Sequence, residues 1–238
     1  MFGQRIAVAA RQRDEGEKPF WISFADLMTA LMVLFLLVMS VALLAATRTT
    51  SEREKREGER QAQIARLLDR VEQAARRTPG VRVDRGRDVI DFGDRARFDV
   101  ASHTLRPEQE RLLRAFVPEV LAIARDEDGR RWLKRVVVEG YTDHNGSYLY
   151  NLNLSLQRSQ RVLCALMARP GADERAMSRQ ELEDIRRLFL VGGFSSNSAK
   201  LSLDASRRIE LRLEFLGIDE PVSANAAPFE GDFGQCAI

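Results

Sequence analysis

Hydrophobic and polar positions divide the chain into stretches with different periods. From Phe20 to Ala46 the residues are apolar almost without interruption, and charged residues are frequent on both sides. A helix of this length rises roughly 40 Å at about 1.5 Å per residue, more than the ~30 Å hydrocarbon core of a bilayer. A cleaved signal peptide has a shorter apolar region, about 7–15 residues long. The pattern therefore predicts an uncleaved transmembrane helix over residues 20–46, after a short leader over residues 1–19.

A helical linker is predicted next, over residues 47–80. Residues 52–60 are charged at every position except Gly58. Beyond them, apolar side chains recur at helical spacing, at Ile64, Leu67, Leu68, Val71 and Ala75. This stripe covers barely two heptads, so it fits a short coiled coil as well as a solvated helical stalk. We favour the solvated stalk.

From Val81 onward, short β-rich runs alternate with amphipathic helices. A hairpin is expected around Arg85-Gly86, strands over residues 135–140 and 207–215, and helices over 106–125, 151–168 and 178–190. Pro107 suits the first turn of its helix, whereas Pro118 should kink or divide it. Ser178 begins a capping box. The sum is a two-layer α/β domain, an α+β sandwich, over residues 81–216, followed by an irregular tail over 217–238.

Composition and charge exclude several classes of function. The formal net charge is +2 and the cations are interleaved with acids, so no basic stripe suggests nucleic acid as a partner. The sequence has no G-x-S-x-G, H-E-x-x-H or Cys/His cluster. Its two histidines, His103 and His144, lie far apart in the sequence. We therefore expect neither an enzyme nor a bound metal or cofactor.

Asp26 is the one acidic residue within the apolar run. An ionised Asp at the centre of a membrane helix costs about 2.5–3.5 kcal/mol on insertion scales, and such residues mark ion pathways. A carboxylate in a low-dielectric environment takes up a proton more readily. Ser23 and Thr29 lie at helical spacing from Asp26, which forms a small polar strip suited to protein or water. The alternative is an Asp that snorkels to the membrane surface, but residues 20–25 are too apolar to favour it.

The stretch FADLMTALMVLFLLVMS resembles the transmembrane signature of the MotB family, the B subunits of ion-driven stator complexes. The resemblance implies that Asp26 carries the coupling ion, and a lone carboxylate without a richer oxygen cluster favours H⁺ over Na⁺. It also implies a homodimer inside a ring of MotA- or ZorA-type membrane subunits, in the bacterial inner membrane. Basic residues flank the span on both sides, so charge alone leaves the orientation open. The family implies a cytoplasmic N-terminus and a periplasmic C-terminal domain.

Within that family, FWISFADLMTALMVLF is most similar to the B subunits of Zorya anti-phage defence systems. A flagellar subunit that serves motility is the alternative.

A second informative stretch follows the strand at residues 135–140. Thr142 and Asp143 come just past the end of that strand, and Asn151 is placed to cap the next helix. Leu154 and Arg158 follow Asn151 on one helical face. An acid and a guanidinium brought together at the start of this helix would hold a zwitterion. Alternatively, Asp143 and Arg158 simply pair with each other in a surface salt bridge.

This stretch resembles the OmpA-like peptidoglycan-binding domain, over roughly residues 81–216. The pattern T-D-x-x-G-S followed by N-x-x-L-S-x-x-R is met by Thr142, Asp143, Gly146, Ser147, Asn151, Leu154, Ser155 and Arg158. The resemblance implies that Asp143 and Arg158 bind the amino and carboxylate groups of diaminopimelate in the stem peptide. SRRIEL, from Ser206, is similar to the family's N-R-R-V-E-I and adds Arg207.

Three features depart from the family pattern. Tyr141 replaces the usual His, Ser206 replaces Asn, and residues 170–189 form a longer segment than usual. A passive OmpA-like cell-wall tether is a further alternative function, although a tether would not need Asp26.

The two cysteines, Cys164 and Cys236, both follow the apolar run. They fit a disulfide in an oxidising compartment, and they fit two inert buried thiols equally well.

Overall fold

The computed structural model describes residues 18–171, 174–221, 231–234 and 236. The predicted leader lies almost wholly outside these residues, as does part of the predicted tail. The chain divides into two units, Met1–Arg56 and Glu57–Ile238. The second unit thus begins well before residue 81, where we predicted the folded domain to start.

The apolar run lies within helix α1, Lys18–Arg76, which is 59 residues long. Among the described residues, α1 is the one helix that is long and apolar enough to cross a membrane, judged by length and composition. Every side chain from Trp21 to Thr50 is exposed within the chain itself. Because so large an apolar surface is not left in water, this part of α1 requires lipid or protein around it.

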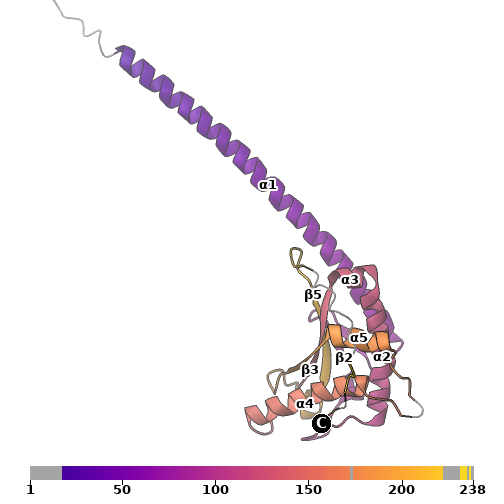
Figure 1. Ribbon diagram of the computed structural model, residues 1–238. Helices are drawn as coiled ribbons and strands as arrows, with labels where there is room; N and C mark the ends of the chain where they lie inside the picture. Colours follow the sequence, from indigo (N-terminus) through magenta and orange to yellow (C-terminus); the bar gives the residue numbers. More distant parts are fainter. Residues whose placement is uncertain (1–17, 172–173, 222–230, 235, 237–238) are drawn as a thin grey trace, which may run out of the picture. The chain divides into compact units, whose positions relative to one another are not determined.

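The second unit is built on a five-stranded sheet with the order β1-β2-β5-β3-β4 (Figure 1). The strands are β1 Arg82–Asp84, β2 Val89–Asp91, β3 Leu133–Gly140, β4 Phe189–Gly193 and β5 Ile209–Phe215. Neighbouring strands are antiparallel except β3 and β4, which run parallel. The predicted hairpin and the predicted strands are confirmed as β1–β2, β3 and β5. Strand β4 was not predicted, and its first two residues take the end of the helix that we expected over residues 178–190.

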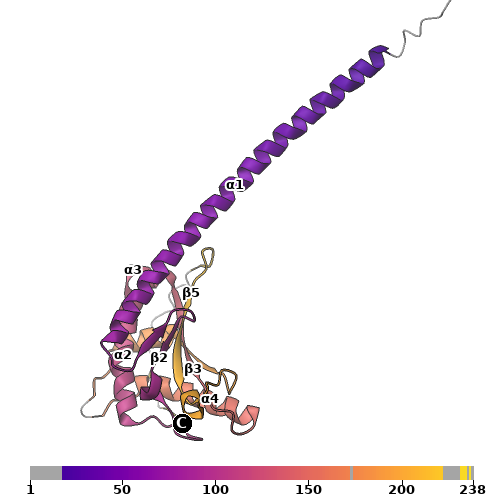
Figure 2. The ribbon, with the colours of Figure 1, turned by 180° about the vertical axis from the view of Figure 1, so that it is seen from behind.

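Three helices, α2 Pro107–Arg125, α4 Tyr148–Met167 and α5 Arg179–Leu188, pack on one face of the sheet. The shorter elements are α3 Glu127–Trp132, which leads into β3, α6 Leu203–Ser206, which precedes β5, and a 3₁₀ turn η1 at Gly93–Ala96. Figure 1 shows α2, α4 and α5 in front of the sheet, and Figure 2 shows the strands in front when the domain is seen from behind. The prediction of a mixed α/β domain with two layers, preceded by a single long apolar helix, is confirmed.

Local signals decide where these helices begin. The predicted capping box is present at α5, where Ser178 Oγ accepts from the Glu181 N–H at 3.2 Å and Glu181 Oε2 accepts from the Ser178 N–H at 2.8 Å. Pro118 lies inside α2 without dividing it, so a division of the helix, one of the two predicted effects, is wrong. The prediction that Asn151 caps α4 is wrong as well. Ser147 caps this helix, since its Oγ accepts from the Tyr150 N–H at 3.3 Å.

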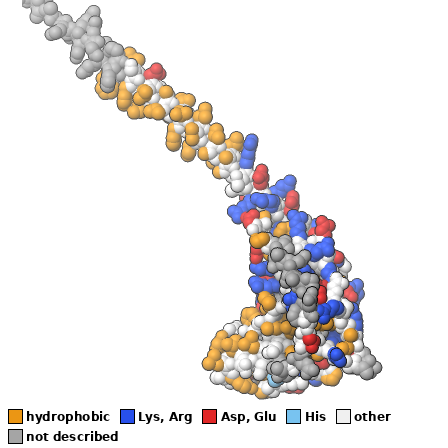
Figure 3. Space-filling view, in the orientation of Figure 1, with side chains coloured by type: hydrophobic (Ala, Val, Ile, Leu, Met, Phe, Trp, Pro, Cys, Tyr) orange, Lys and Arg blue, Asp and Glu red, His pale blue; other side chains and the backbone are white. Residues whose placement is uncertain are grey.

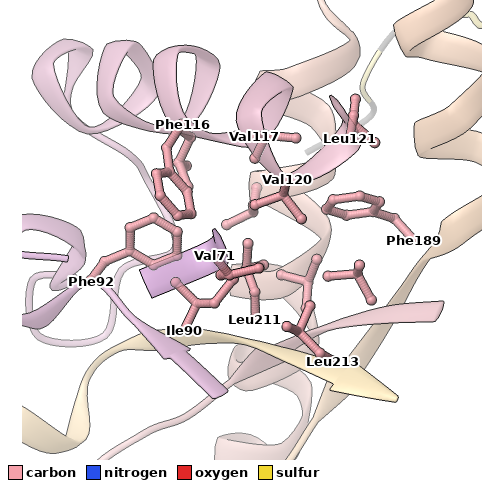
Figure 4. Packing of buried hydrophobic residues seen from close by; sticks show 14 of the residues in the cluster. Val71, Ile90, Phe92, Phe116, Val117, Val120, Leu121, Phe189, Leu211 and Leu213 are labelled. Carbon is pink, nitrogen blue, oxygen red and sulfur yellow. The ribbon is translucent and has the colours of Figure 1, made fainter. Parts of the chain in front are cut away.

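The hydrophobic core lies between the helices and the sheet, and the end of α1 belongs to it. Leu67, Leu68, Val71, Ala74 and Ala75 are all buried in the same cluster as α2 and the strands. Figure 4 shows Val71 among side chains of α2, β2 and β5. Four residues of the predicted stripe are thus buried, and the fifth, Ile64, packs partly buried against the same cluster. Our prediction of a solvated stalk is therefore wrong for this part of α1, which forms one edge of the core.

The opposite face of the sheet carries buried charges that are paired. Glu139 is 1 % exposed, and Arg212 Nε donates to its Oε1 at 2.6 Å. Glu210 is fully buried, and Arg208 Nε donates to its Oε1 at 2.7 Å. Tyr141, which stands where the family has His, donates its hydroxyl proton to Glu139 Oε2 at 2.8 Å. Pairing of this kind is what allows a carboxylate to be buried in a sheet.

Cys164 on α4 and Cys236 are joined in a disulfide, with 5.7 Å between their Cα atoms. The sequence had left a disulfide and two inert thiols open, and the structure has the disulfide. The two cysteines are separated by 72 positions in the sequence, and the loop that the bond closes includes α5, β4 and β5.

Candidate functional site

The candidate binding site lies where β3 ends against the start of α4. A Cβ atom on Gly140 would lie only 1.9 Å from the carbonyl oxygen of Ser155, so only glycine lets the strand approach the helix this closely. Directly after it, the Thr142 N–H donates to the carbonyl of Ser195 at 3.0 Å. These two contacts fix the loop over residues 141–147, which carries the predicted Thr142 and Asp143.

Asp143 is a buried carboxylate with two fixed partners. Its Oδ1 accepts from the Asn145 N–H at 3.0 Å, and its Oδ2 accepts from Arg207 Nη1 at 3.1 Å. The ion pair of Asp143 is thus with Arg207. The surface salt bridge between Asp143 and Arg158, which the sequence left open, does not form.

Arg158 is fully buried, and backbone oxygens accept its hydrogen bonds. Its Nε, Nη1 and Nη2 donate to the carbonyls of Ser102, Tyr141 and Asp99 at 2.9, 2.7 and 3.1 Å. Burial lowers the pKa of Arg158 to about 10, while the negative charge of Asp143 acts in the opposite direction. The guanidinium therefore stays charged at neutral pH and ties the loop over residues 98–102 to the loop that carries Asp143.

Arg207 links the site to the last strand. Its Nε donates to the carbonyl of Phe98 at 3.1 Å, and its Nη2 pairs with Asp204. Burial opposes its charge, but the hydrogen bonds to Asp143 and Asp204 outweigh this effect and raise the pKa of Arg207. Two of the candidate site residues, Arg207 and Asp143, are thus in direct contact.

The other predicted residues lie close to this group or beneath it. Asn151 Nδ2 donates to the carbonyl of Asn145 at 3.1 Å and so braces the loop from inside α4. Leu154 is buried on the same helix. Within the described part of the chain, the buried hydroxyl of Thr142 has no hydrogen-bond partner. A buried hydroxyl without a partner, beside a carboxylate, is a position where a ligand can supply the missing hydrogen bond.

Sequence reasoning missed several residues that hold this arrangement. Asp99, Ser102 and Ser195 act through backbone oxygens, which no side-chain pattern reveals. Asp204 lies three residues before Arg207, and this spacing was the one available signal. Together the site gathers the carboxylate of Asp143 and the guanidinium groups of Arg158 and Arg207, with Arg158 buried beneath the loop. The described residues hold no group of three or more His, Cys, Asp or Glu side chains placed to bind a metal ion.

The second candidate, Asp26, lies on the exposed apolar part of α1. The hydroxyl of Thr29 donates a hydrogen bond to the backbone carbonyl of Asp26 at 2.8 Å, so the Thr29 hydroxyl has a partner within its own helix. Ser23, Asp26 and Thr29 follow one another every three residues and form the polar strip that the sequence predicted. The carboxylate is exposed within this chain, in a stretch whose other exposed side chains are mostly apolar.

Comparisons with known proteins connect both parts of the chain to described families. A family model described as membrane MotB of the proton-channel complex MotA/MotB matches residues 7–50. The Zorya protein ZorB of Escherichia coli O139:H28 (strain E24377A / ETEC) is 46% identical over 221 residues, which cover 92% of this chain and 90% of that protein.

Similar solved structures include the periplasmic domain of Helicobacter pylori MotB, at 14% identity and a TM-score of 0.42, which covers 61% of this chain and 85% of that one. They also include the cell wall anchor of the T6SS from Pseudomonas aeruginosa, at 22% identity and a TM-score of 0.40, with coverage of 63% and 97%.

Proposed function

The chain belongs to the family of the Zorya protein ZorB, and on that premise we propose that it is the non-enzymatic B subunit of a proton-driven rotary membrane motor. In this role Asp26 passes the coupling ion and the second unit holds the subunit to peptidoglycan. The observation that carries the proposal is the combination on one chain of a membrane acid, within a segment matched by the MotB model, and a buried Asp–Arg site. Asp26 is retained at a cost of insertion that a simple anchor would avoid.

The proposed ion is H⁺ rather than Na⁺. Sodium is held best by several oxygen ligands, whereas Asp26 is the only carboxylate between Trp21 and Thr50. A single carboxyl group instead carries one proton at a time. The proposed partner is a ring of MotA- or ZorA-type subunits around a homodimer of this chain, and this ring would enclose the exposed apolar part of α1.

Ion conduction is tested with Asp26→Asn, which keeps the size of the side chain but cannot exchange a proton. We expect no proton flux into vesicles that contain the variant together with its A-type partner, and unchanged assembly of the complex. Ser40→Ala is the control, because Ser40 is another polar residue on the exposed apolar part of α1 and its hydroxyl bonds within the helix, to the Leu36 carbonyl at 2.7 Å. Wild-type flux through the Asn variant would sink the idea that Asp26 carries the ion.

Wall binding is tested at the second site, with diaminopimelate of the stem peptide as the proposed ligand. The ammonium group would meet Asp143, and the carboxylate would meet the guanidinium groups of Arg158 and Arg207. We expect Asp143→Ala and Arg158→Ala to abolish pulldown with purified peptidoglycan. Arg179→Ala, in an exposed ion pair on α5, is the control and should bind normally. Undiminished binding by both site variants would move the site elsewhere.

The proposed location is the bacterial inner membrane, with residues 1–19 in the cytoplasm and the second unit in the periplasm. The Cys164–Cys236 disulfide supports this orientation, because disulfides persist in oxidising compartments. A thiol-blocking reagent applied to intact spheroplasts without reductant should leave both sulfur atoms unlabelled. Labelling under these conditions would argue against a periplasmic disulfide.

Defence against phage is the proposed use of the motor, since the relative at 46% identity is named for a Zorya system. Loss of protection in the Asp26→Asn strain, with swimming unchanged, would support this use. A flagellar subunit would show the reverse. A passive tether would show neither effect.

A further inference from the structure

Three consecutive apolar residues begin α4 and are exposed. Tyr148 is 54 % exposed, Leu149 73 % and Tyr150 48 %, directly after the capping residue Ser147. Helix initiation does not need large apolar side chains at these positions. Runs of exposed apolar residues are avoided in soluble domains unless they bind something. Val100, at 67 %, is a fourth such residue.

These four residues, which we call the apolar rim, belong to the two loops that Arg158 ties together. Val100 lies between Asp99 and Ser102, whose carbonyls both accept from Arg158. Tyr148 to Tyr150 follow the loop that carries Asp143. The rim therefore borders the buried acid–guanidinium site on both loops. Figure 3 shows hydrophobic side chains gathered over the N-terminal part of α4.

The aromatic part of the rim is held in place. The carbonyl of Tyr148 accepts from Ser195 Oγ at 3.2 Å. Gly146 backs onto the ring of Tyr150 so closely that a Cβ there would lie 3.1 Å from Cδ1. Tyrosine has few rotatable bonds, so two tyrosine rings on a fixed helix start supply contact area at a low cost in entropy.

We propose that the apolar rim binds the sugar rings of the glycan strand next to the stem peptide, which extends and rests on the proposed binding of peptidoglycan. The stem peptide is covalently attached to the glycan, and a tripeptide spans at most roughly 10 Å. A site that holds the diaminopimelate therefore brings sugar over the surrounding surface. A sugar ring has an apolar C–H face and a hydroxyl edge, which match the face and the phenol group of tyrosine.

The test measures binding of two probes to the full-length chain in detergent. One probe is the stem tripeptide that ends in diaminopimelate, and the other is the same tripeptide attached to its disaccharide. We expect wild type to bind the disaccharide-tripeptide roughly fivefold or more tightly than the tripeptide. The double variant Tyr148→Leu, Tyr150→Leu should lose this preference and bind the tripeptide as wild type does. Leu190→Ser, an exposed apolar position on β4, should keep the preference.

The outcomes separate this inference from the function on which it rests. Equal affinity of wild type for the two probes would overturn sugar binding and leave wall binding intact. No binding of either probe would contradict the proposed function itself. If the double variant keeps its sugar preference, and instead loses binding to anionic phospholipid vesicles or loses self-association, the rim serves a membrane or a second copy and the inference is overturned.

Discussion

The substitution Leu67→Ala tests whether the end of α1 is part of the domain core. Leu67 is 3 % exposed and lines a cavity of about 10 Å³ together with side chains of α2 and β5. A space this small leaves little room for neighbours to relax, so removal of three carbon atoms should leave a void. Such substitutions cost roughly 2–5 kcal/mol, and we expect about 3 kcal/mol here. For a domain of this size, that loss lowers Tm by about 6–12 °C.

Trp132 provides the assay. The chain has two tryptophans, so Trp21→Phe leaves Trp132 as the only indole. Trp132 is 8 % exposed, and its Nε1 donates to the side chain of Gln63 on α1, so its fluorescence reports on this contact. Thermal unfolding of the full-length chain in detergent is then followed by emission.

Leu201→Ala is the matched control, since Leu201 is fully exposed and the substitution is the same. A solvated stalk predicts nearly equal Tm values for both variants, because Leu and Ala are both good helix formers. Equal values would refute the placement of Leu67 in the core.

Three further predictions concern stability. Cys236→Ser should lower the free energy of unfolding by up to about 4 kcal/mol, the loop entropy expected for a separation of 72 residues. A reductant should have no further effect on the denaturation midpoint of this variant. If the variant and the wild type have the same midpoint without reductant, the native chain has no disulfide. Gly140→Ala should prevent folding, because the backbone of α4 blocks the new methyl group. Gly58→Ala is the control, since it has open space and should stabilise its helix by up to about 1 kcal/mol. Circular dichroism measures both effects, and a folded Gly140→Ala variant would contradict the close approach of strand and helix. Burial raises the pKa of Asp91, but the hydrogen bond from Lys200 outweighs this effect and lowers the pKa below 3.8. Ionised Asp91 therefore stabilises the fold above pH 3.8, and this stability is lost as the pH falls through the lower pKa of the folded state. Asp91→Asn should flatten the acid limb of a stability–pH curve, and an unchanged limb would refute the pairing.

Sequence pattern predicted the elements whose signals are local. The capping box at Ser178, the hairpin around Arg85-Gly86 and the apolar run of α1 each depend on a few neighbouring residues. The two candidate sites were likewise visible as motifs, and the structure brings Asp143 and Arg207 together from positions 64 residues apart.

Pattern could not decide which partner each side chain takes. The stripe from Leu67 onward has the same helical period whether it faces water, another helix or a sheet. Which of these surfaces it packs against depends on contacts between distant residues. One such contact joins Arg60 to the carbonyl of Leu216, 156 residues away. Arg158 is the clearest case at the site. Its partners are three backbone carbonyls, and their positions are set by loop geometry rather than by residue type.

The disulfide also imposes an order in time on maturation. Cys164 is synthesised 72 residues before Cys236, which at ~5–20 residues per second corresponds to a delay of roughly 4–14 s. During this interval Cys164 has no native partner, and α5, β4 and β5 are still being made. A copy exposed to an oxidant in that window can cross-link to a second unfinished copy. Because Cys236 follows β5 in the chain, the native bond can close only after every strand of the sheet has been synthesised.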